Sequence, residues 1–104
     1  MLKRRFEILL PRTHNDGRAV ADEKLQQTFE ELIARFGATS FSSGSVQGEW
    51  THEGKRYQDE SRKLIVDVDA TKKNERFFEK WKLQLRERFE QIEIYIISIA
   101  IKIH

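Results

Sequence analysis

The sequence lacks cysteine altogether, contains a single proline and five glycines among 104 residues, and has no long apolar run. Without cysteine there can be no disulfide framework, no thiolate metal site and no cysteine nucleophile, and this composition favours the cytoplasm. The most hydrophobic segment, residues 92–103, includes Glu93, Ser98 and Lys102 and is about half as long as a membrane-spanning helix. No membrane segment, repeat or linker is therefore expected.

The chain also lacks an excess of either charge, since 19 Lys and Arg residues face 17 Asp and Glu residues for a net charge of +2. Such a balance is typical of a solvated surface, so a nucleic-acid partner is not expected. Hydrophobic residues make up 38% and aromatic residues 11% of the chain, which is enough for one core. We therefore expect a single domain over residues 1–104. The apolar stretch after the basic N-terminus stops at Pro11, so no secretory signal is expected.

Hydrophobic spacing in the first third of the chain predicts a strand, a loop and a helix. Apolar residues alternate over residues 2–10, which predicts a strand ended by Pro11. The polar segment 12–18 contains an Asn-Asp-Gly sequence and predicts an exposed loop. A helix is expected to follow, with Asp22 as its N-cap and Gly37 as its stop. Its apolar stripe is Leu25, Phe29, Leu32, Ile33 and Phe36.

The remaining segments predict two strands joined by a turn, a second helix and a last strand. Residues 39–50 and 55–69 read as antiparallel strands that meet at residues 51–54. Thr71 can cap a second helix with one apolar face, and residues 92–103 close the chain as a strand. The order strand-helix-strand-strand-helix-strand is the signature of a ferredoxin-like α+β sandwich. We expect a four-stranded antiparallel sheet with both helices on one face.

The last strand is apolar on both of its faces, which points to a partner. Its odd-numbered residues would lie on the helix-free face of the sheet, where they would form an exposed apolar patch. A second identical sheet is the simplest cover, so we predict a homodimer through the sheet at Tyr95, Ile97, Ile99 and Ile101. The alternative is a bulge near Ile97 that exchanges the buried face within a monomer.

Candidate ligand-binding residues gather in the first loop and in the predicted hairpin, which share one end of a ferredoxin-like sheet. A rim of charged, imidazole and aromatic groups there suits a polar or anionic ligand. The residues of this predicted rim are Arg12, His14, Asp16, Trp50, His52 and Glu60. His14, Asp16, His52 and Glu53 could instead hold a divalent metal, but no spacing fixes two ligands on one element, so no metal and no cofactor is assigned.

An enzymatic alternative depends on carboxylates near the strand ends. Asp67, Asp69 and Glu7 could meet on the open sheet face and serve a metal-dependent nuclease or hydrolase. Asp69 serves equally well as a strand terminator before the Thr71 cap. We therefore favour a non-enzymatic homodimeric module for a polar or anionic ligand or a protein partner, and assign no catalytic residue.

The hairpin motifs also resemble a known group of proteins. Gly48-Glu49-Trp50, Gly54, Glu60-Ser61 and the strand 64–66 are similar to a family of small uncharacterised bacterial proteins with a Gly-x-Trp hairpin and a Glu-Ser strand. That resemblance implies a ferredoxin-like fold with no assigned activity. Size and strand order are also similar to the Cas-two endoribonuclease family, which has an Asp at the end of its first strand where this sequence has Leu10-Pro11.

Overall fold

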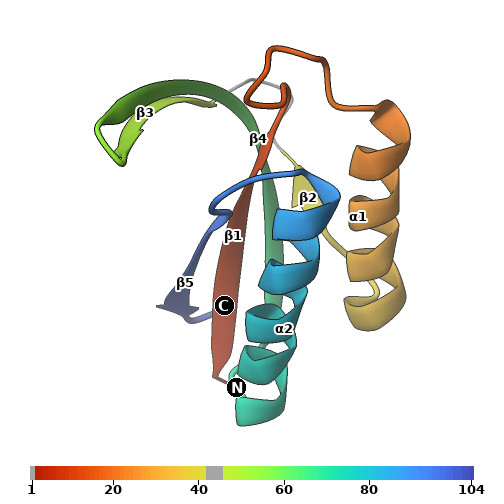
Figure 1. Ribbon diagram of the computed structural model, residues 1–104. Helices are drawn as coiled ribbons and strands as arrows, with labels where there is room; N and C mark the ends of the chain where they lie inside the picture. The colour runs from red at the N-terminus through yellow and green to blue at the C-terminus, as the bar shows by residue number, and fades with distance from the viewer. Residues whose placement is uncertain (1, 42–45) are drawn as a thin grey trace.

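The structure is a computed structural model that describes the backbone of residues 2–41 and 46–104, and the side chains of residues 2–40, 53–55 and 61–104. It confirms an α+β chain with two helices and an antiparallel sheet (Figure 1). In chain order, its elements are β1 (Lys3–Pro11), α1 (Asp22–Phe36), β2 (Ser40–Phe41), β3 (Val46–His52), β4 (Lys55–Asp69), α2 (Lys72–Arg88) and β5 (Tyr95–Ile101). Within these described ranges, no helix is long and apolar enough to cross a membrane.

Within the described residues, the sheet has five strand segments, where four strands were expected. Its order is β2-β4-β1-β5, and β3 also pairs with β4. The described parts of the segment expected to form one strand are β2 and β3, and both pair with the 15-residue β4. β2 lies opposite Leu64 and Ile65, and β3 lies opposite residues 55–61. Only the second part of β4, from Ser61 to Asp69, pairs with β1. The β3–β4 hairpin therefore continues past the end of β1 and curves away from the helices (Figure 1).

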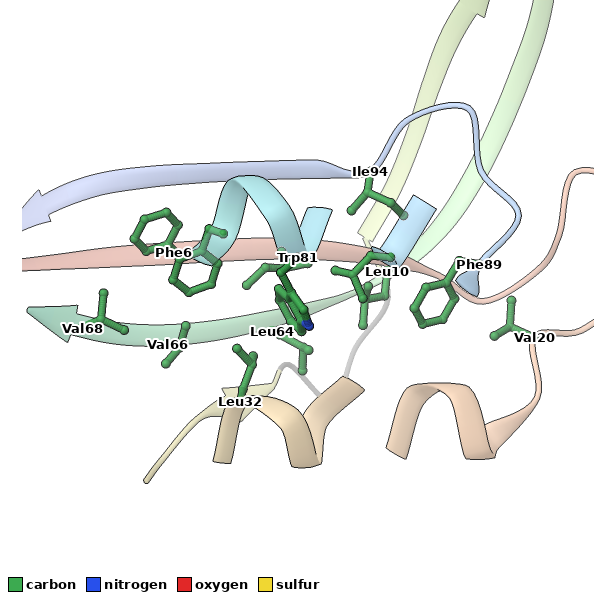
Figure 2. Packing of buried hydrophobic residues seen from close by; sticks show 13 residues of the cluster. Phe6, Leu10, Val20, Leu32, Leu64, Val66, Val68, Trp81, Phe89 and Ile94 are labelled. Carbon is green, nitrogen blue, oxygen red and sulfur yellow. The ribbon is translucent and has the colours of Figure 1, made fainter. Parts of the chain in front are cut away.

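Both helices cover the same face of the sheet, as predicted (Figure 1). Alternate residues of β1 point toward them, and Ile8 and Leu10 are almost completely buried. Phe6 stacks on Phe78 of α2 with ring centroids 3.8 Å apart. Figure 2 shows side chains from β1, β4, α1 and α2 meeting in one cluster. The buried cluster comprises Phe6, Ile8, Leu10, Val20, Leu32, Leu64, Val66, Val68, Phe78, Trp81, Leu85, Phe89 and Ile94.

The helix ends follow the sequence signals in two of three cases. Gly37 terminates α1 in the left-handed conformation at φ 82°, which glycine adopts without strain. The hydroxyl of Thr71 accepts a hydrogen bond from the Asn74 amide and caps α2. The prediction that Asp22 caps α1 is wrong, because Ala21 occupies the cap and makes no side-chain bond there. Asp22 is instead the first helical residue, where its carboxylate faces the positive end of the helix dipole.

The last strand is shorter than expected and contains no bulge. It begins at Tyr95 rather than residue 92, because Ile94 turns into the core while Ile92 remains partly exposed. Its register with β1 advances one residue at a time from Tyr95 opposite Leu9 to Ile101 opposite Lys3. The alternative of a bulge near Ile97 is therefore wrong.

A polar network joins the two helices at one side of the core. The Arg88 guanidinium donates to both carboxylate oxygens of Glu31 at 2.8 Å and to the Thr28 hydroxyl at 2.8 Å. The indole of Trp81 donates to Glu31 Oε1 at 2.9 Å. Burial alone would raise the pKa of Glu31, but the hydrogen bonds from Arg88 and Trp81 outweigh it and lower the pKa. The carboxylate therefore fixes α1 against α2 in its ionised form.

Replacing Glu31 with Gln is expected to reduce the free energy of unfolding by about 2 kcal/mol at pH 7, because Arg88 loses its ionic acceptor. A folded-state pKa below the unfolded value means that this stabilisation is present at neutral pH and is lost as the pH falls below about 4. Urea unfolding of both proteins at pH 7 and pH 3 measures the difference. It should shrink at pH 3. Glu30→Gln, on the adjacent exposed position, is the control, and an equal loss in both variants would contradict this role for Glu31.

Candidate functional site

The loop between β1 and α1 is folded back on itself by backbone hydrogen bonds. The amide of Val20 donates to the Arg12 carbonyl at 2.9 Å, and the amide of His14 donates to the Arg18 carbonyl at 2.7 Å. Gly17 has φ 90°, a conformation that suits glycine at this reversal. Buried Val20 anchors the loop on the core. The loop is thus a defined turn at the end of the sheet.

His14 lies inside the protein rather than on the predicted rim. Its side chain is only 5% exposed, and Nδ1 lies 3.2 Å from the Phe89 carbonyl oxygen and 3.4 Å from Glu90 Oε2. These contacts join the β1–α1 loop to the turn that follows α2. The prediction that these two segments lie at the same end of the sheet is therefore confirmed. His14, however, is buried between them and is not an exposed residue of a binding rim.

The charged side chains around His14 neutralise one another. Arg18 donates to Asp16 Oδ2 at 2.6 Å and to Glu90 Oε1 at 3.3 Å, and Lys24 Nζ lies 3.5 Å from Glu90 Oε2. The pKa of Asp16 is lowered by hydrogen bonds from the Arg18 backbone and side chain, and the pKa of Glu90 is lowered mainly by the Arg18 hydrogen bond. The carboxylate of Asp16, a predicted ligand-binding residue, is therefore already paired with Arg18.

The hairpin half of the predicted rim is separate from this loop. The side chains of Trp50, His52 and Glu60 lie outside the described residues, and only their backbones are placed. His52 is at the hairpin tip opposite Lys55, six register positions beyond the Pro11–Ser61 pair, or roughly 20 Å along the strands. The backbone of the tip therefore lies well beyond the point where β1 ends and the loop begins. Glu60, by contrast, lies just past the end of β1, next to the level of half-buried Arg12.

The carboxylates of the nuclease alternative are each paired with a cation on the open sheet face. Arg5 donates to both oxygens of Asp67 at 2.8 and 3.0 Å, and this hydrogen bonding lowers the pKa of Asp67. Lys3 pairs with Asp69 at 2.6 Å and Lys63 with Glu7 at 3.2 Å. Among the described residues, no group of three or more His, Asp or Glu side chains could hold a metal ion. The geometry therefore does not favour the metal-dependent reading.

A cavity of about 340 Å³ opens between α1 and the sheet, close to the same end. Its apolar walls come from the core residues Leu10 and Leu64 and from two partly buried residues of α1, Leu25 and Phe29. Figure 2 shows Leu10 and Leu64 on the strands that face the helices. Its polar lining consists of Asp22, Gln26 and Arg62. An apolar cavity with a few polar groups is the usual form of a small-molecule site.

Arg62 is the residue of this cavity that the sequence analysis did not single out. It lies directly opposite Leu10 in the β1–β4 register, so its side chain leaves the sheet on the helix side. In the part of the chain that the structure describes, no carboxylate forms an ion pair with it. The signal was present in the sequence: the inward series Val68, Val66 and Leu64, continued by two residues, ends at Arg62.

The open sheet face carries the apolar strip expected from the last strand. Tyr95 is 58% exposed and Ile99 46% exposed, and Ile97 and Ile101 are partly exposed. Leu9 of β1 and Ile65 of β4 extend the strip across the sheet. The ion pairs of Arg5 and Lys3 border the β5 side of the strip, whereas Glu7, paired with Lys63, lies between Ile97 and Ile65.

Comparison with known structures supports the fold class. A CutA1 from Oryza sativa has a TM-score of 0.66 at 12% identity, covering 100% of this chain and 84% of that chain. The divalent cation tolerance protein CutA1 from Thermus thermophilus has a TM-score of 0.64 at 12% identity, covering 98% and 86%. A phage SAM lyase in complex with S-methyl-5′-thioadenosine has a TM-score of 0.69 at 16% identity, covering 97% and 90%.

These likenesses establish a shared fold and nothing finer, since all three identities are low. No protein-family model matches the sequence, and no curated protein matches it either. The architecture is consistent with the predicted ferredoxin-like class, whereas no comparison supports the resemblance to the family of small bacterial proteins. The neighbours differ in role, one being a divalent cation tolerance protein and another a SAM lyase, so the shared fold does not define the function of this chain.

Replacing Glu90 with Gln is expected to loosen the β1–α1 loop without unfolding the protein. Arg18 and Lys24 lose an anionic partner and buried His14 loses its contact with the carboxylate, and these interactions hold a surface segment rather than the core. Hydrogen exchange of the His14, Gly17 and Val20 amides should accelerate about two- to fivefold. Glu87→Gln, one turn earlier on α2, is the matched control. Unchanged exchange in Glu90→Gln would show that backbone hydrogen bonds alone hold the loop.

Proposed function

We propose that this chain is a non-catalytic, homodimeric module that binds a polar or anionic small molecule in the cavity between α1 and β4. Arg62 carries the proposal, because this half-buried arginine leaves β4 on the helix-facing side and lines the cavity, where its guanidinium donors suit an anion. Within the described ranges its own chain supplies no such anion. A bound carboxylate or phosphate would complete the site through two parallel N–H donors.

The predicted rim residues surround this site in part. Arg12 and Glu60 lie at the level where β1 ends, close in register to Arg62, and we keep them as the outer edge of the binding region. Trp50 and His52, on the projecting hairpin, are assigned to a second contact region for a protein partner. The cysteine-free composition supports a cytoplasmic location.

Replacing Arg62 with Gln is expected to weaken binding of an aromatic carboxylate at least tenfold, since the charged donor pair is lost. The probe is 3-phenylpropionate, titrated into ¹⁵N-labelled protein and followed by NMR. Shifts should cluster at the amides of Leu10, Leu25 and Leu64. Lys63→Gln is the control, because its side chain leaves the same strand on the opposite face.

Two competing probes decide the alternatives suggested by the structural neighbours. Zinc chloride and S-methyl-5′-thioadenosine are tested separately for a rise in the unfolding midpoint, which specific binding produces by mass action. If zinc raises the unfolding midpoint, and the rise is lost in His14→Ala but kept in Arg62→Gln, the protein has a cation site and the proposed anion site is wrong. The proposal would also be overturned if 3-phenylpropionate causes the same amide chemical-shift changes in Arg62→Gln as in the original protein.

Self-association follows from the open face of the sheet. The strip formed by β5 together with Leu9 and Ile65 leaves large apolar side chains in water, an arrangement that usually marks an interface. The neighbouring charges are already paired within the chain, so an identical face can cover the strip without burying an unpaired ion. A second copy is therefore the occupant we propose.

Replacing Ile99 with Lys is expected to abolish the dimer, because a cation would be buried at the centre of the strip. Light scattering coupled to size-exclusion chromatography should give about twice the chain mass of 12.4 kDa for the original protein and the mass of one chain for the variant. Leu83→Lys is the control, as Leu83 is 62% exposed on α2. A soluble monomer before any substitution would show that the strip is not an interface.

A further inference from the structure

We infer that the α1–β4 cavity takes a zwitterion with an apolar body, the chemistry of an α-amino acid with an apolar or aromatic side chain. This inference rests on the binding site proposed above and specifies its ligand class. It requires a second charged group opposite Arg62, and the cavity supplies one in Asp22.

Asp22 and Arg62 line the same cavity from opposite walls. Asp22 comes from the first turn of α1 and Arg62 from the inward row of β4. No ion pair joins them, and among the described residues neither has another ion-pair partner. Opposite charges that line one cavity without meeting leave room for a molecule that satisfies both. Arg62 would bind the carboxylate, and Asp22 would accept hydrogen bonds from the ammonium group.

The rest of the lining specifies the body of the ligand. Leu10, Leu25, Phe29 and Leu64 form the apolar surface, and Gln26 is the remaining polar residue. The charges of the lining sum to zero, which favours a neutral zwitterion over a simple anion, because Asp22 would repel an anion. A volume of about 340 Å³ lies at the small end of ligand sites.

Asp22 also has a structural role that the experiment must separate from binding. Acidic residues in the first turn stabilise a helix through its dipole, and α1 has two of them, Asp22 and Glu23. Glu23 does not line the cavity. Glu23→Gln therefore removes a comparable dipole interaction without touching the proposed site, and it is the matched control for Asp22→Asn.

The test compares matched ligands that differ by one charge. L-phenylalanine, 3-phenylpropionate and 2-phenylethylamine are titrated at pH 7 by NMR, together with L-leucine and L-methionine and their deaminated acids. We expect at least one amino acid to bind about tenfold more tightly than its deaminated acid. Asp22→Asn should remove that difference while leaving the acid's affinity unchanged or improved. Arg62→Gln should weaken both.

The outcomes separate this inference from the proposed function. If the acids bind as tightly as every amino acid and depend only on Arg62, the anion site stands and the zwitterion is overturned. If no probe shifts the amides of Leu10 or Leu64, both are overturned. If Glu23→Gln reduces amino-acid affinity as much as Asp22→Asn does, the effect belongs to the helix, and the assignment of Asp22 is wrong.

Discussion

Packing of both helices against one face of the sheet is the constraint on which the rest of this structure depends. The inward residues of β1, especially Ile8 and Leu10, are buried by α1 and α2 together. Because strand side chains alternate, that burial decides at once which residues of β1, β4 and β5 face the solvent. The paired charges and the isoleucines therefore lie on the open face, because the alternate residues of the same strands are the ones that the helices bury.

The sequence was a good guide wherever one period dominated. Alternation in β1 and the stripe Leu25, Phe29 and Leu32 in α1 identified these elements, because an element buried on one side has its apolar residues at a regular spacing. Gly37 and Thr71 marked helix ends because backbone geometry and amide donors there suit those residues. The fold class followed from element order, which is insensitive to errors of two or three residues at each boundary.

What the sequence could not provide was the distance between segments. The hairpin turn at Glu53 and Gly54 was predicted correctly, but pattern alone does not say how far β4 runs beyond β1. His52 was thus expected near His14, from which its backbone is well separated along the hairpin. Burial of a polar residue is equally hard to predict from the sequence. His14 is buried where its ring contacts the Phe89 carbonyl and Glu90, and these partners are 75 or more residues away along the chain. Arg62 was missed for the opposite reason, since a charged residue at the end of an inward row breaks the pattern that identifies the row.

The two proposed surfaces use opposite faces of one strand, and this has a consequence for their independence. Arg62 and Leu64 of β4 face the helices and the cavity, whereas Lys63 and Ile65 face the open side. A second copy on the open face therefore leaves the cavity entrance beside α1 uncovered, and a ligand in the cavity does not compete with the dimer. The two surfaces share the hydrogen-bonded layer of the sheet but no side chain, so substitutions in one leave the contacts of the other unchanged.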